Sequence, residues 1–187
     1  MHLVFVVETT ENNDSDKMYI SKYISICCPQ LKESPDNLLS WVYLNGKGNY
    51  RKGSVLKKVN DLIARYNRFH PNENDTYVLY CVDIDDTNQT ASAEENKQIN
   101  KEIEAFCRKE GYELVWFNRT IEEVFLGRTV KQAKDKKREA NAFMKKKTSI
   151  DDFPPERLKK SFYSESVRKS TNLGFVLDVL VNQNKKQ

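Results

Sequence analysis

Residues 77–86, which read YVLYCVDIDD, decide the fold of this chain. Six apolar or aromatic residues lead directly to Asp83, and such a short run of β-branched and aromatic side chains is typical of a buried strand. Three other stretches have the same character: residues 3–7 (LVFVV), 41–44 (WVYL) and 112–117 (YELVWF). We therefore predict four short buried strands.

Helical patterns separate these strands. Residues 16–28 end before Pro29, and residues 92–111 begin with a Ser-x-x-Glu capping pattern and end at Gly111. The clearest pattern is in residues 54–69, whose apolar side chains on one helical face are Val55, Val59, Leu62, Ile63 and Tyr66. Strands that alternate with helices predict an α/β fold of Rossmann-like type, a four-stranded parallel sheet flanked by helices.

The pattern changes after Gly127, so we expect two parts. Residues 1–126 form the α/β domain, and residues 127–187 form a basic helical extension packed on it. A basic helix runs to Lys147, Pro154 and Pro155 interrupt the chain, and an amphipathic helix ends it.

The composition excludes several classes of protein. The chain has 187 residues, about the length of one domain. No apolar run reaches the roughly 18 residues of a membrane-spanning helix, and residues 3–7 are too short for a signal peptide core. Two His and no Cys-x-x-Cys pair argue against structural zinc and against a His-based active site. We expect a cytoplasmic protein whose cysteines stay reduced.

The charge is distributed unevenly along the chain. Residues 128–147 contain nine Lys and Arg and two acids, a net charge of +7, whereas residues 1–40 carry a net charge of −3. A basic segment of this kind predicts a nucleic-acid partner, although a solvated helix face is the alternative. The side chains expected to contact nucleic acid are Lys131, Lys134, Lys137, Arg138, Lys145 and Lys146.

Acidic residues follow the predicted strands, where ligands of parallel sheets bind. Glu8 ends the first strand, and Asp83 and Asp85 follow the third at a spacing that directs both carboxylates to one side. Their hard oxygens suit Mg²⁺ or Mn²⁺. We predict a metal site at Glu8, Asp83 and Asp85, with a catalytic role for all three, and Glu122 as support for a second ion. The alternative is that these acids are solvated caps.

In their order along the chain, these residues resemble the TOPRIM fold, and more closely the RloB-like and AbiLii-like TOPRIM proteins of bacterial phage-defence loci. The similar features are Val6-Val7-Glu8 followed by Asp16 and Tyr19, the Asp-x-Asp pair, and a segment in which Asn118 and Glu122 match. The resemblance implies metal-dependent hydrolysis of phosphodiester bonds in DNA or RNA. It also implies an ATPase partner of the ABC or SMC type.

Two other functions stay open. The chain departs from the TOPRIM pattern at Thr9 and Arg119, which leaves room for a non-catalytic subunit that binds the ATPase. An apolar stripe on the final helix could dock this partner, although packing on the sheet is the more ordinary explanation; it consists of Leu173, Val176, Leu177, Leu180 and Val181. The second alternative is a phosphatase that resembles haloacid dehalogenases, with Asp83 as nucleophile and Asp85 as general acid.

Overall fold

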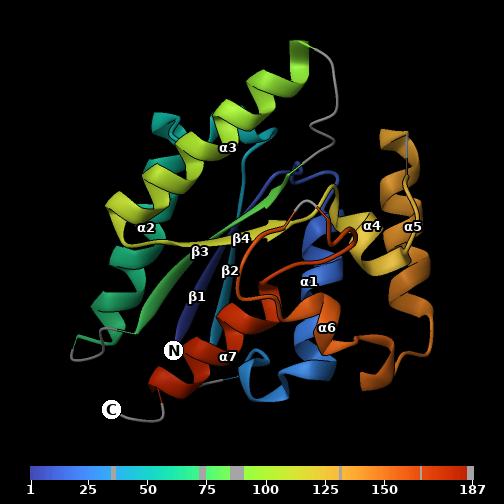
Figure 1. The fold of residues 1–187 in the computed structure, drawn as a ribbon. Coiled ribbons are helices and arrows are strands. Elements are labelled where there is room, and N and C mark those ends of the chain that lie inside the picture. The colour runs from blue at the N-terminus through green and yellow to red at the C-terminus, as the bar shows by residue number, and fades with distance from the viewer. Residues whose placement is uncertain (35–36, 72–74, 85–90, 131, 165, 185–187) are drawn as a thin grey trace.

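The computed structural model describes residues 1–34, 37–71, 75–84, 91–130, 132–164 and 166–184. Its centre is a parallel sheet of four strands in the order β2-β1-β3-β4 (Figure 1). The strands are β1 (His2–Val7), β2 (Leu38–Tyr43), β3 (Thr76–Asp83) and β4 (Glu113–Phe117). The predicted α/β fold with a four-stranded parallel sheet is confirmed.

Helices cover both faces of the sheet (Figure 1). One face packs against α2 (Gly53–Phe69) and α3 (Ala91–Glu110), and the other against α1 (Ser15–Cys27), α4 (Ile121–Leu126) and α7 (Leu173–Asn184). The short elements are η1 (Pro29–Leu31), η2 (Lys47–Asn49), η3 (Ile150–Asp152) and α6 (Pro155–Leu158). Successive strand residues point to opposite faces, so Phe5 and Val7 join the α1 core while Val4 and Val6 join the α2 core.

The remaining helix, α5 (Ala133–Lys145), packs on α1. The ammonium group of Lys22 on α1 is buried and donates hydrogen bonds to the carbonyl oxygens of Phe143 (2.5 Å) and Lys146 (2.6 Å). A cation placed at the last carbonyls of a helix satisfies acceptors that have no partner within the helix and interacts favourably with its dipole. This contact fixes where α5 ends, two residues before the predicted Lys147.

Local signals placed most element ends correctly. Thr120 caps α4 by accepting a hydrogen bond from the Glu123 N–H (3.2 Å), and Gly111 follows α3 in the left-handed conformation with φ of 70°. The main difference is β2, which begins at Leu38 instead of residue 41. Leu38 and Leu39 pair with β1 despite their partial exposure. A search for buried apolar runs in the sequence does not find the start of such an edge strand.

The C-terminal segment closes one edge of the sheet. The side chain of Asn172 accepts a hydrogen bond from the Trp116 N–H (2.9 Å) and donates one to the Leu114 carbonyl (2.8 Å), and both partners are backbone groups of β4. Beside it, the Asn118 N–H donates to the Ser170 carbonyl at 2.8 Å. The segment before α7 therefore satisfies backbone groups that a further strand would otherwise bind.

The apolar stripe of α7 is buried against the sheet. All five of its residues are at most 7% exposed and belong to the core on the α1 face; they are Leu173, Val176, Leu177, Leu180 and Val181. The alternative in which this stripe docks an ATPase partner is therefore wrong, because the chain itself covers it.

The described residues contain no helix that is both long and apolar enough to cross a membrane. All four cysteines have free thiols. Cys28, Cys81 and Cys107 are buried, and burial raises the pKa of the Cys28 and Cys107 thiols to about 12. These buried thiols act as small apolar core residues.

Replacing Asn172 with Ala should destabilise the fold, because it leaves the Trp116 N–H and the Leu114 carbonyl of β4 without partners. We expect the free energy of unfolding, measured with urea, to fall by about 1–3 kcal/mol. The matched control is Asn182→Ala on the exposed side of α7, the helix that follows Asn172. Equal effects of the two substitutions would contradict the role given to Asn172.

Candidate functional site

Two predicted acids meet at the carboxyl ends of β1 and β3. The Asp83 N–H donates a hydrogen bond to Glu8 Oε1 (2.7 Å), and Asp83 Oδ1 accepts one from the N–H of Ile121 (2.9 Å), the first residue of α4. Each carboxylate therefore accepts a backbone hydrogen bond that supports the fold, and each lies at the edge of the sheet where ligands bind. Each hydrogen bond occupies one of the two oxygens of the carboxylate.

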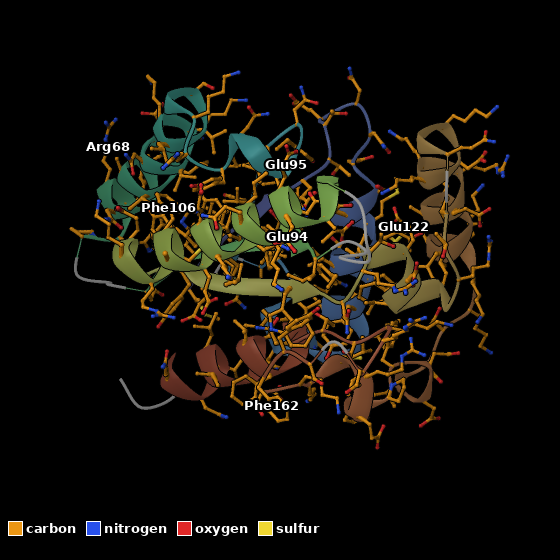
Figure 2. The ribbon with its side chains drawn as sticks, turned by 45° about the horizontal axis from the view of Figure 1, so that its top comes forward. Arg68, Glu94, Glu95, Phe106, Glu122 and Phe162 are labelled. Atoms are coloured by element: carbon orange, nitrogen blue, oxygen red, sulfur yellow. The ribbon has the colours of Figure 1, made fainter. Side chains whose placement is uncertain are left out.

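Asp16 and Glu122 extend this acidic group toward α1 and α4. Asp16 is 7% exposed and accepts a hydrogen bond from the Thr9 N–H (3.2 Å), whereas Glu122 is completely buried. In Figure 2, Glu122 lies where α4 comes close to α1 and α5. Its ion pair is with Lys136 Nζ on α5 at 3.3 Å. We call Glu8, Asp16, Asp83 and Glu122 the acidic cluster.

The members of the acidic cluster perturb each other's protonation. Burial, then Glu8, Asp16 and Glu122, hold the pKa of the Asp83 carboxyl well above its usual value. Burial and Glu122 raise the pKa of Asp16 to about 6, against the opposing effect of Lys136. Burial alone would lower the pKa of Lys136, but Glu122, Asp83 and Asp16 raise it. The cluster thus has more negative charge than Lys136 neutralises.

Three buried oxygen atoms beside the cluster have neither a hydrogen bond nor an ion pair with the described part of the chain. They are Glu122 Oε2, Tyr19 Oη and Thr9 Oγ1. Burial and Glu122 raise the pKa of Tyr19, so the phenol stays protonated and retains a proton to donate. Buried polar atoms are normally paired, and such a group of exceptions indicates a place where a water or an ion binds.

A second lysine reaches the same edge of the sheet. Lys47, in the loop after β2, is 7% exposed and donates a hydrogen bond from Nζ to the Asp83 carbonyl (3.0 Å). Gly46 before it has a φ of 97°, which favours glycine and turns the chain toward β3. The local sequence is Gly46-Lys47-Gly48. A lysine between two glycines at a strand end was the available signal.

The acids predicted to bind metal do not form a ready-made coordination shell. Glu8, Asp83 and Glu122 lie at the predicted edge, whereas Asp85 lies outside the described residues. Within the described ranges, no three His, Cys, Asp or Glu side chains are arranged to hold a metal ion. The phosphatase alternative depends on Asp85 as well, so it stays an untested prediction.

The predicted nucleic-acid face is largely engaged in ion pairs with the protein itself. Lys137 forms an ion pair with Asp14 (3.1 Å), and Arg138 forms one with Asp135 (3.1 Å). Lys146 is paired with Asp152 at 3.7 Å. Exposed pairs such as these contribute little to stability and exchange readily for phosphate. Exposed Lys134 and Lys145 form no ion pair with a described residue, and Lys131 lies outside the described residues.

Comparison with family models, curated proteins and solved structures found no significant match to this chain. The functional argument therefore depends on the geometry and chemistry of the site.

Asp16→Asn should make the protein more stable at neutral pH. The folded-state pKa of about 6 lies above the ordinary 3.8, so the stabilisation from protonated Asp16 is complete below pH 3.8 and is lost as the pH rises through 6. We expect the variant to gain on the order of 3 kcal/mol in unfolding free energy at pH 7.5 and nothing at pH 3.5.

Urea titrations across this pH range measure the effect. The control is Glu95→Gln, which neutralises an exposed carboxylate on α3 and should leave the pH profile unchanged. A wild-type protein as stable as the Asp16→Asn variant at pH 7.5 would contradict the charge imbalance inferred for the acidic cluster.

Proposed function

We propose that this protein is a metal-dependent hydrolase of phosphodiester bonds in nucleic acid. The observation that carries the proposal is the acidic cluster at the carboxyl edge of a parallel sheet, where four carboxylates lie together and Glu122 is ion-paired with Lys136. Like charges held together at this density favour the binding of a cation.

The chemistry of the cluster fits Mg²⁺ or Mn²⁺. Its donors are hard carboxylate oxygens, and the unpartnered Glu122 Oε2 and Tyr19 Oη supply further oxygen atoms. Glu8 and Asp83 would hold the ion, and Glu122 and Asp16 would add charge behind them. When bound, such an ion polarises a phosphate oxygen and lowers the pKa of a coordinated water.

The protein's own residues have separate tasks in this proposal. Asp83 is oriented by the Ile121 N–H, and Glu8 is oriented by the Asp83 N–H, so both carboxylates are held at the sheet edge before the substrate arrives. Glu8 either completes the set of ion ligands or takes the proton of the attacking water. Lys47, directed to the end of β3, adds positive charge near the phosphate.

Helix α5 connects the acidic cluster to the basic face. Lys136 points from this helix to Glu122, while Lys134 and Lys145 on the same helix are exposed. Their charges would hold the phosphate backbone beside the cluster. The resemblance to phage-defence TOPRIM proteins adds the expectation of a cytoplasmic defence effector with an ABC or SMC-type ATPase partner.

A non-catalytic regulatory subunit is the second candidate. The observation that favours it is the ion pair between Lys136 and Glu122, because a resident ammonium group already neutralises part of the charge that a metal would bind. In that case the acidic cluster would bind neither Mg²⁺ nor Mn²⁺, and the basic face would recognise its partner without cleavage.

Glu8→Gln and Asp83→Asn should each reduce cleavage of nucleic acid in the presence of Mn²⁺ by about 100-fold or more, since each removes a charge on which ion binding depends. Both substitutions keep the oxygen that accepts the structural hydrogen bond from Asp83 N–H or Ile121 N–H. The measurement is gel analysis of single-stranded and double-stranded DNA and RNA.

Thermal unfolding with and without Mn²⁺ separates loss of the metal from loss of the fold. Mn²⁺ should raise the Tm of the wild type, raise that of Lys136→Met more because the competing ammonium is gone, and leave Asp83→Asn unchanged. Glu95→Gln is the control for a lost surface carboxylate. No cleavage by the wild type and no response to Mn²⁺ would reject the hydrolase in favour of the regulatory subunit.

Replacing both Lys134 and Lys145 with Glu should weaken nucleic-acid binding and flatten its salt dependence, because two phosphate contacts are lost. The slope of log Kd against log salt concentration should change by about 1.4–1.8 units. The control is Lys109→Glu at the end of α3, also an exposed lysine. Unchanged affinity of the Lys134/Lys145 variant, measured by fluorescence anisotropy, would reduce the basic face to a solvated helix.

A further inference from the structure

A pocket lies on the opposite face of the sheet from the acidic cluster. It has a volume of about 500 Å³ and opens between α3, β4 and the segment at residues 161–163. Figure 2 shows β4 running between α3 on one side and the C-terminal segment with Phe162 on the other. The volume is within the range of small-molecule sites.

Aromatic side chains dominate one side of this pocket. The rings of Trp116 and Tyr163 meet edge to face with centroids 5.4 Å apart. Phe162 is 70% exposed although it is large and apolar. The exposed ring of Phe162, beside Trp116 and Tyr163, provides a surface on which a flat ligand can stack. In the free protein this exposure is unfavourable, because a large apolar ring stays in contact with water.

The α3 side of the pocket is polar and positively charged. Lys97 and Lys101 are one helical turn apart and exposed, and neither forms an ion pair with a described residue. Asn100 lies between them and donates a hydrogen bond from Nδ2 to the Ile84 carbonyl (3.2 Å), while its buried Oδ1 accepts none from a described residue. The pocket therefore combines cations, an unused acceptor and aromatic rings.

We propose that this pocket binds one base of a single-stranded nucleic acid, with Phe162 stacked on the base and Lys97 and Lys101 on its flanking phosphates. Every base has an aromatic face, and its amino or imino N–H groups match the free acceptor of Asn100. The proposal depends on the proposed function only in taking nucleic acid as the ligand, because it uses none of the carboxylates of the acidic cluster.

The position of the pocket relates it to the acidic cluster. Ile84 lines the pocket and is the next residue after Asp83, so the two sites occupy opposite faces at the same end of β3. Two acids line the pocket: Glu104 is paired with Arg108 at 2.9 Å, and Glu113 leaves one negative charge against the two positive charges of Lys97 and Lys101. A paired base is stacked within its duplex and cannot enter such a pocket, which makes the single strand the expected ligand.

The fluorescence of Trp116 provides a direct measurement of binding. Because the chain has two tryptophans, Trp41→Phe leaves Trp116 alone, and Phe retains the ring that stacks on Phe5. An oligothymidylate of about twelve nucleotides, titrated in EDTA, should change this fluorescence. In the same background, Phe162→Ala should weaken binding by about tenfold.

Matched variants control for nonspecific effects. Phe69→Ala removes a ring that is 72% exposed on α2, far from this pocket in sequence, and should leave the dissociation constant unchanged. Lys97→Ala and Lys101→Ala should each reduce the slope of log Kd against log salt concentration by about 0.7, the value for one phosphate of a single strand. The control is Lys58→Ala, which removes an exposed lysine on α2 and should leave this slope unchanged.

Four outcomes overturn the proposal: no change in Trp116 fluorescence, an unchanged affinity of Phe162→Ala, equal binding of a duplex, or equal binding of thymidine monophosphate. The last would assign the pocket to free nucleotides. Failure here with Mn²⁺-dependent cleavage intact leaves the hydrolase standing. Binding of single strands by a protein that cleaves nothing supports the pocket and rejects the hydrolase.

Discussion

The rest of the structure depends on how the end of β3 is held. The Asp83 N–H binds the Glu8 carboxylate from β1, and the Asp83 carboxylate binds the first N–H of α4. These two hydrogen bonds join the central strands to the helix that carries Glu122. The same side chains supply the charge of the acidic cluster, so the fold and the candidate site share one set of contacts and a substitution in either affects both.

The charge of the acidic cluster explains why α5 lies where it does. Two of the four acids, Asp16 and Glu122, are buried, which is costly, and Lys136 provides compensating charge from a helix that Lys22 holds against α1. Removing Lys136 leaves Glu122 buried without its ion pair. The helix is therefore part of the electrostatic design of the site, and its exposed lysines are brought beside the cluster by the same contact.

The sequence was sufficient for the sheet, because alternating strands and helices with apolar runs leave little choice of architecture. It also placed Glu8 and Asp83 at one edge, since the carboxyl ends of parallel strands coincide. It did not reveal Lys47 or Lys136, whose partners lie 36 and 14 residues away and follow no local pattern. Counting charges likewise overestimated the free basic face, because acids such as Asp14 come from distant elements.

The closure of β4 by Asn172 has a consequence for the protein in a crowded solution. An open sheet edge is a template for strands of other molecules, which leads to aggregation. Here a single amide group binds the donor of Trp116 and the acceptor of Leu114, the same groups that an incoming strand would use. A neighbouring chain must expel Asn172 before it can add to this edge, so one side chain protects the β4 edge from pairing with a strand of another molecule.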